Sequence, residues 1–257
     1  MIKKSNKVEE IKFHDAYYQH GLRHTSRSWF ERCSEASYPS GLNHRVEVLK
    51  ALGDVKEKRV LELGCGSGEL TAILANDGAY VSTIDISLEA IEITQKKCKE
   101  YVEKVIVQQM DANNLSYMNE SFDLVVGELV LHHLDYIKIA VEVARVLQPC
   151  GRAVFVEPLA HNPFLNVWRR MTSGIRTSSE WPLTYSNISE MGSYFRLARC
   201  HEFGLLPLLS SLVFLLTFSH RAKVASGEFL VRLDTPLLEL CKPLRRYCSG
   251  ILIELMR

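Results

Sequence analysis

Three glycines stand two residues apart in the segment VLELGCGSGEL, which covers residues 60–70. Gly64, Gly66 and Gly68 follow an apolar run and precede a stretch with helical periodicity, so we expect them in a turn between a strand and a helix. One glycine would be enough for a simple turn. The repeated glycine therefore predicts a loop whose main chain lies directly against a ligand, because glycine has no side chain to keep other atoms away.

Acidic residues follow the next two apolar runs. Asp85 and Ile86 end the segment YVSTIDI, and Asp111 and Ala112 follow KVIVQQM. A carboxylate at Asp85 can accept hydrogen bonds from both hydroxyls of a ribose. Asp111 can reach an adenine amino group, and the main chain at Ala112 an adenine ring nitrogen. These residues predict a nucleoside site. The nucleoside carries no phosphate tail, because no lysine or arginine neighbours the loop and no Gly-Lys-Ser/Thr follows it.

Apolar runs alternate with helical segments from Lys58 onward. We expect five strands, at RVLELG, YVSTID, KVIVQQMD, FDLVVGEL and RAVFVEP. This alternation predicts an α/β fold with a doubly wound, mostly parallel sheet, helices on both faces and the ligand site at the carboxyl ends of the strands. Ser87 is expected to cap the second helix. Beyond Pro158 we expect a helix beginning near Ser189, a sixth strand at FRLARCHEFGL and an antiparallel closing strand at GILIELMR.

The chain divides into three expected parts. Residues 1–42 are rich in aromatic and charged side chains and predict an N-terminal helical lid, with Asn43 as the cap of the next helix. Residues 43–204 predict a Rossmann-like core that binds the nucleoside. Residues 205–257 predict additional C-terminal helices followed by the closing strand.

The composition is that of an ordinary globular protein. Of the 257 residues, 47% are hydrophobic and 24% charged, and a net charge of +1 argues against a nucleic-acid partner. The seven cysteines show neither metal-ligand nor disulfide spacing and predict reduced thiols in the cytoplasm. The N-terminal residues have no apolar segment of a secretory signal. The apolar run at residues 204–218 is too short for a membrane-spanning helix and contains Pro207.

Five segments in this order resemble the successive motifs of class I S-adenosylmethionine-dependent methyltransferases of the type 11 branch. They are VLELGCGSGELT, TIDIS, QMDANNL, FDLVVGELVLHHLD and RVLQPCGRAVFVEP, within residues 58–158. The resemblance implies a seven-stranded sheet of order 3-2-1-4-5-7-6 and S-adenosyl-L-methionine as the cofactor. It also implies which residues bind that cofactor: Tyr18, Glu62, Gly64, Cys65, Gly66, Gly68, Asp85, Ile86, Asp111, Ala112 and Glu128.

Individual roles follow from the same resemblance. Glu62 and Gly64 would face the methionine moiety, and Glu128 would lie near the sulfonium. A leading helix often folds over the cofactor in this superfamily, which makes Tyr17 or Tyr18 the candidate that closes the pocket. Tyrosines at helical spacing also occur simply as core residues.

Two further segments, EPLAHNP and RTSSEWPL, resemble a branch of mostly small-molecule methyltransferases. Ala160 stands where that branch has a glycine, and Trp181 where it has a histidine. If that histidine touches the acceptor, Trp181 implies a more apolar or aromatic acceptor.

Candidate general bases lie after the fourth and fifth predicted strands. His132 and His133 occur in LHHL, Glu157 ends the fifth strand and His161 follows it. Each also has a structural alternative: the histidine pair can pack or contact the cofactor, and Glu157 can accept hydrogen bonds from main-chain groups of a neighbouring loop. No metal site is expected, because these residues lack a compact ligand spacing.

Four functions remain open on the sequence. The first is methylation of a small apolar or aromatic metabolite at oxygen, nitrogen or carbon, as in secondary metabolism. The second is methylation of a lipid or lipid-linked saccharide at a membrane surface, where the run at 204–218 with His220, Arg221 and Lys223 would touch the lipid. The third is methylation of RNA or protein, and the fourth is a non-catalytic partner subunit that only binds the cofactor. Neither the acceptor nor the oligomeric state follows from the sequence.

Overall fold

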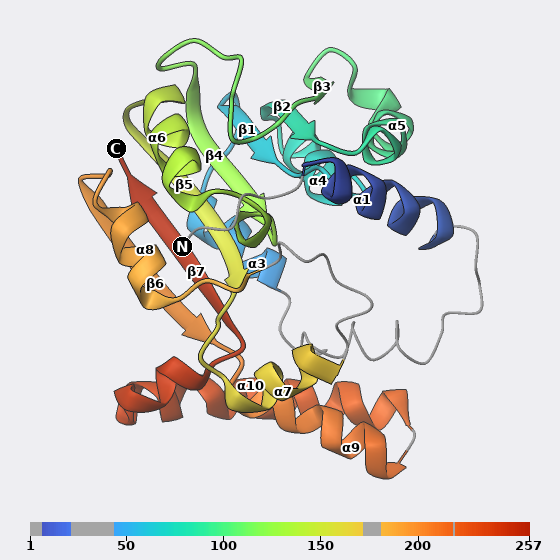
Figure 1. Ribbon diagram of the computed structural model, residues 1–257, viewed down its shortest axis with the longest axis vertical. Coiled ribbons are helices and arrows are strands. Elements are labelled where there is room, and N and C mark those ends of the chain that lie inside the picture. Colours follow the sequence, from blue (N-terminus) through green and yellow to red (C-terminus); the bar gives the residue numbers. More distant parts are fainter. Residues whose placement is uncertain (1–6, 22–43, 172–180, 218) are drawn as a thin grey trace.

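The computed structural model describes residues 7–21, 44–171, 181–217 and 219–257, built around one seven-stranded sheet (Figure 1). The sheet has the order β3-β2-β1-β4-β5-β7-β6. Only β7 runs antiparallel to its neighbours, β5 and β6. The predicted fold class, strand order and closing strand are thereby confirmed. The strands are β1 (Arg59–Leu63), β2 (Tyr80–Asp85), β3 (Val105–Gln109), β4 (Phe122–Glu128), β5 (Leu147–Pro158), β6 (Leu197–Phe203) and β7 (Gly250–Met256).

Helices cover both faces of the sheet. They are α1 (Lys7–Gly21), α3 (His44–Leu52), α4 (Glu69–Asn76), α5 (Leu88–Lys97), α6 (Tyr136–Val146), α7 (Pro163–Met171), α8 (Tyr185–Gly192), α9 (Ser210–Thr217) and α10 (His220–Leu240). The described residues also form short 3-10 turns: η2 (Lys99–Tyr101), η3 (Leu131–His133), η5 (Leu206–Leu209) and η6 (Lys242–Tyr247).

Side chains at alternate positions of β1 belong to two separate hydrophobic cores, one on each face of the sheet. Leu61 and Leu63 pack with Ile139 of α6 on one face of the sheet. Val60 packs with Leu74 of α4 on the other face. Both faces of the central strands are therefore buried, which explains why their sequences are continuous apolar runs rather than alternating ones.

Polar caps fix where the helices begin. The Ser87 hydroxyl accepts a hydrogen bond from the Ala90 amide, as expected for the cap of α5. The expected start near Ser189 is wrong. Helix α8 begins at Tyr185, because Thr184 and Asn187 form a capping box there and leave Ser189 inside the helix. Asn43 lies outside the described residues.

The C-terminal helices lie below the sheet in Figure 1. The apolar run forms η5 and α9 rather than one long helix, and α9 packs against α10. Buried Asp234 of α10 accepts hydrogen bonds from the amides of Gly204, Leu205 and Leu206, which fastens α10 to the end of β6. Among the described helices, none has the length and apolar character needed to span a bilayer. The division at residues 42 and 204 stays a prediction.

Candidate functional site

A cavity of about 1200 Å³ opens at the carboxyl ends of β1, β2, β3 and β4. Its other walls are α1, the first turn of α3, the loop around η3 and residues 181–187. The structure brings ten of the eleven cofactor-binding candidates to this cavity: Tyr18, Glu62, Gly64, Cys65, Gly66, Asp85, Ile86, Asp111, Ala112 and Glu128.

All three glycines of the loop between β1 and α4 have a positive φ. The angles are 77° at Gly64, 52° at Gly66 and 71° at Gly68. Each of the three positions therefore has a conformation that residues other than glycine rarely adopt. Gly68 also differs in position from the other two. It is not part of the cavity wall, and a Cβ there would lie 2.9 Å from the Thr94 Cα, so Gly68 permits close packing of α4 on α5.

The amides of the loop are used within the protein. Gly64 and Cys65 donate to the Ile84 carbonyl at 2.8 and 3.1 Å, and Gly66 donates to Asp85 Oδ2 at 3.1 Å. Gly68 donates to the Cys65 carbonyl. A phosphate-binding loop directs its amides at the ligand instead. The loop therefore lets a ligand come close to the main chain but offers few amide donors for a phosphate. This agrees with the predicted ligand, a nucleoside without a phosphate tail.

Two aspartates hold the ends of β2 and β3 in place. Asp85 accepts from the amides of Gly66 and Ser87, so its carboxylate faces the glycine loop. Asp111 accepts from the Asn113 amide and pairs with Lys7 at 3.2 Å. Burial opposes the charge of Asp111, but these hydrogen bonds lower its pKa, so it stays ionised. Both carboxylates can accept hydrogen bonds from a ligand in the cavity.

Glu62 is the most deeply buried acid of the cavity wall, with 2% of its surface exposed. Its Oε2 accepts hydrogen bonds from the hydroxyls of Thr71 and Thr83 at 2.5 and 2.8 Å. Burial raises the pKa of Glu62 to about 7, although the two hydroxyls stabilise the carboxylate. Its charge therefore changes near neutral pH.

This pKa gives the first prediction. The folded protein favours protonated Glu62, whereas the unfolded chain releases that proton near pH 4.5. We expect the free energy of unfolding of the ligand-free protein to be highest below that pH and to fall by up to about 3 kcal/mol as the pH rises to about 7. Urea unfolding at pH 5 and pH 8, compared with Glu62→Gln, measures this contribution. An equal pH dependence in both proteins would contradict it.

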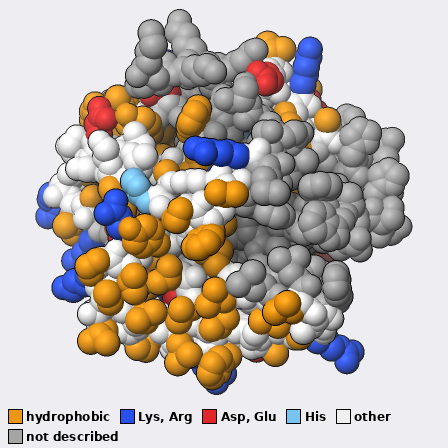
Figure 2. Space-filling model, turned by 60° about the horizontal axis from the view of Figure 1, so that its bottom comes forward, with side chains coloured by type: hydrophobic (Ala, Val, Ile, Leu, Met, Phe, Trp, Pro, Cys, Tyr) orange, Lys and Arg blue, Asp and Glu red, His pale blue; other side chains and the backbone are white. Residues whose placement is uncertain are grey.

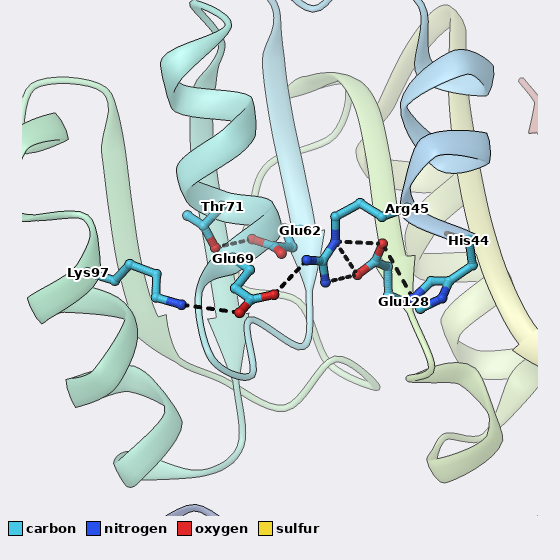
Figure 3. A network of polar contacts seen from close by, with 7 residues as sticks. All are labelled: His44, Arg45, Glu62, Glu69, Thr71, Lys97 and Glu128. Carbon is cyan, nitrogen blue, oxygen red and sulfur yellow. Dashed lines mark hydrogen bonds and ion pairs between the residues drawn. The ribbon is translucent and has the colours of Figure 1, made fainter. Parts of the chain in front are cut away.

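Arg45, from the first turn of α3, crosses the cavity wall between two acids (Figure 3). Its Nη2 and Nε donate to Glu128 Oε2 at 2.7 and 3.1 Å, and Nη1 donates to Glu69 Oε2 at 2.7 Å. Burial disfavours the charge of Arg45, but the two carboxylates raise its pKa above the usual value. Glu128, expected near the sulfonium, is thus held by a guanidinium, and His44 Nε2 lies 4.0 Å from its Oε1. Sequence reasoning missed Arg45, which belongs to no motif.

Helix α1 lies over the ends of β1, β2 and β3, where a lid was expected. Asp15 accepts from the Ser87 hydroxyl at 2.5 Å, and Tyr18 packs beside Cys65 at the glycine loop. The nearest atom to a Cβ added at Gly66 is the Tyr18 hydroxyl, at 2.9 Å. Tyr17 has 60% of its surface exposed. Burial raises the pKa of both Tyr18 and Cys65, so both are neutral at pH 7.

Glu157 is completely buried and binds the loop after β4. Its Oε1 accepts from the amides of Val130 and Leu131 at 2.8 and 2.7 Å, and its Oε2 lies 2.6 Å from His132 Nδ1. Glu157 is not part of the cavity wall. The observed contacts agree with the structural alternative for Glu157, which positions His132 at the cavity, and a direct role of Glu157 in proton transfer stays a prediction.

The other two candidate bases lie apart. His133 lines the cavity, and burial lowers its pKa, so its ring is neutral at pH 7. His161 does not line the cavity; it stacks on Tyr185 and accepts a hydrogen bond from its amide. The role of His161 as a base stays a prediction. Trp181 is 64% exposed at the cavity rim, and its amide donates to the His132 carbonyl.

Comparison with known families agrees with this geometry. Residues 61–155 match the family described as a methyltransferase domain. These residues are therefore similar to a methyltransferase domain, and they contain the glycine loop, Asp85 and Asp111 at the cavity. Among curated relatives, demethylmenaquinone methyltransferase of Tropheryma whipplei is 31% identical over 149 residues. That alignment covers 54% of this chain and 61% of the relative, so the chain matches less than two thirds of the relative's length.

Solved structures share the fold over nearly the whole chain. Geranyl diphosphate C-methyltransferase from Streptomyces coelicolor superposes with a TM-score of 0.64 and 12% identity, covering 99% of each chain. The [4+2]-cyclase SpnF superposes with a TM-score of 0.62 and 15% identity, covering 99% of this chain and 97% of the cyclase. At such identities these matches show the fold alone. The cyclase further illustrates that one fold hosts different reactions.

Proposed function

We propose that the protein transfers the methyl group of S-adenosyl-L-methionine to a small apolar or aromatic molecule. The observation that carries this proposal is the row of acceptors at the cavity: Glu62, Asp85 and Asp111 at the ends of three adjacent strands, beside a loop poor in free amide donors. These acids suit a cationic nucleoside and disfavour a phosphate. S-adenosyl-L-methionine supplies a methyl group on a positively charged sulfur.

The wall of the cavity suits both ends of this cofactor. Asp85 would accept hydrogen bonds from the ribose hydroxyls, and Asp111 from the adenine amino group, in place of its contact with Lys7. The amino-acid end carries an ammonium and a carboxylate. Glu62 offers an acceptor for the ammonium, and Arg45 a guanidinium for the carboxylate. The site thus provides a complementary group for each polar part.

The protein contributes position and a dry environment to the transfer. The acceptor atom must come within about 3 Å of the methyl carbon, in line with the sulfur. His132 and His133 border this part of the cavity, and His133 is neutral at pH 7. The imidazole of either histidine can take the proton of a hydroxyl acceptor, provided that the hydroxyl lies within hydrogen-bond distance of an unprotonated ring nitrogen. Residues of helix α1 line the same cavity.

Replacement of Asp85 tests the cofactor site. Asp85→Ala is expected to weaken binding of S-adenosylhomocysteine by about 1–3 kcal/mol, because the ribose loses a charged hydrogen-bond acceptor. Isothermal titration measures the affinity. Asp123→Ala is the matched control, since Asp123 accepts from the Arg59 amide at the opposite end of the strands. Wild-type affinity of Asp85→Ala would place the ribose elsewhere.

The acceptor is identified by incubating the purified protein with methyl-labelled cofactor and fractionated extract of the source cells. Label in a small apolar compound supports the proposal. Cofactor binding without label in any fraction would instead favour the non-catalytic partner subunit. We further propose a cytoplasmic location, supported by free thiols at the six cysteines that the structure describes.

A second candidate function is methylation of a lipid at a membrane surface. The helices α7, α9 and α10 expose large apolar side chains, among them Phe164 at 82%, Leu216 at 82% and Phe229 at 62%. Figure 2 shows hydrophobic side chains gathered on the side of the molecule where these helices lie. The Tropheryma whipplei relative is named for demethylmenaquinone, which favours a hydrophobic acceptor.

Sedimentation with phospholipid vesicles separates the two candidates. A protein that works at the membrane should sediment with the vesicles, and Leu216→Ser should lose part of that binding. Leu88→Ser is the matched control, because Leu88 is an exposed leucine of α5. A wild-type protein that stays in the supernatant would exclude the lipid at a membrane surface. The acceptor would then be a freely diffusing metabolite.

A further inference from the structure

Three potential metal ligands meet where α1 covers the cavity. Glu10 and His14 stand four residues apart on α1 and face the same way, and His133 comes from η3. Their ligand atoms all lie within 4.8 Å of one another. All three residues also line the cavity. The fold thus gathers two imidazoles and one carboxylate from segments that lie far apart in the sequence.

The distances within this cluster match those of a bound ion. Glu10 Oε2 lies 3.4 Å from His14 Nε2 and 3.3 Å from His133 Nδ1. Two donor atoms that each lie about 2.0–2.1 Å from a tetrahedral zinc ion are about 3.3 Å apart. The two imidazole rings meet edge to face, with centroids 5.1 Å apart.

His133 provides an independent observation. Its Nδ1 is buried and forms no hydrogen bond of regular geometry with any residue that the structure describes. This nitrogen has the 3.3 Å contact with Glu10 Oε2 in place of a regular hydrogen bond, and a buried polar atom in that position calls for an explanation. A metal ion between the three side chains would satisfy this atom.

We propose that Glu10, His14 and His133 bind one divalent transition-metal ion, zinc by the nature of the ligands. Three protein ligands leave the fourth position open, as in zinc sites that act on substrates. That position faces the cavity, where it would hold an oxygen atom of the acceptor; this last step rests on the proposed methyl transfer. The assignment departs from the sequence-based expectation of no metal, because that expectation considered neither residue of α1.

Cobalt titration of the chelator-treated full-length protein tests the site. We expect one Co²⁺ per chain and the visible absorption bands of a four-coordinate ion. His14→Gln and His133→Gln should each weaken binding by about tenfold or more. His161→Gln is the matched control and should bind Co²⁺ like the wild type, since His161 lies outside the cavity.

Two results would overturn the proposal. One is a wild-type protein that binds no Co²⁺, which would make the cluster a metal-free contact between α1 and η3. The other is undiminished binding in both His14→Gln and His133→Gln. Titration of the same chelator-treated protein with S-adenosylhomocysteine keeps this question apart from the proposed function: cofactor binding without Co²⁺ binding refutes only the metal site, and the reverse result refutes only the methyl-transfer proposal.

Discussion

Gly66→Val is expected to abolish measurable binding of S-adenosylhomocysteine. Gly66 has a φ of 52°, which a β-branched residue adopts only with strain. A Cβ at this position would also lie 2.9 Å from the Tyr18 hydroxyl, so the side chain would fill the narrow space between the loop and α1. The valine would therefore occupy the surface on which the cofactor is proposed to lie.

Gly53→Val separates this loss from backbone strain. Gly53 also has a positive φ, 66°, but the nearest atom to its Cβ is Arg152 Nη2 at 3.6 Å, outside the cavity. The control should lose roughly 1–3 kcal/mol of stability and keep its cofactor affinity. Isothermal titration and urea unfolding measure both quantities. If Gly66→Val binds as well as Gly53→Val, the glycine loop is not the cofactor site.

Glu157→Gln is expected to lower the free energy of unfolding by about 3 kcal/mol. The carboxylate accepts from two main-chain amides and contacts His132 Nδ1 in a fully buried position. Glutamine keeps one acceptor oxygen and turns an amide group toward donors, which leaves buried polar groups unpaired. Because Glu157 positions the loop that carries His132 and His133, the variant should also lose activity.

Glu120→Gln is the control for this substitution. Glu120 is exposed and pairs with Arg257 at 3.0 Å, so its replacement should cost less than about 1 kcal/mol. Urea unfolding of both variants gives the comparison. A Glu157→Gln protein as stable as Glu120→Gln would show that the loop after β4 is held by other contacts.

The sheet could be predicted because its signals are local. Each buried strand is a short apolar run, and each run ends in glycine, aspartate or glutamate at the ligand edge, so the order of residues already places Gly66, Asp85 and Asp111 together. The start of α8 was misplaced for an equally local reason. Thr184 and Asn187 cap that helix together, and a lone serine further on gave a competing signal.

The rest of the site depends on contacts between distant segments. Arg45, Glu10 and His14 are polar residues of ordinary helices, and only the packing of α1 and α3 against the strand ends brings them to the cavity. The role of Glu157 likewise depends on the path of the loop after β4. Of these, Glu10 and His14 had one sequence signal, their four-residue spacing on a predicted helix.

A crystal structure of the protein with S-adenosylhomocysteine would show where the proposed cofactor binds. We expect the amino-acid part beside Glu62 and Arg45, the ribose on Asp85 and the adenine near Asp111 and Ala112, all against the loop that contains Gly64 and Gly66. Electron density for the compound at another place, or none in a cavity that the protein's own side chains fill, would contradict this expectation.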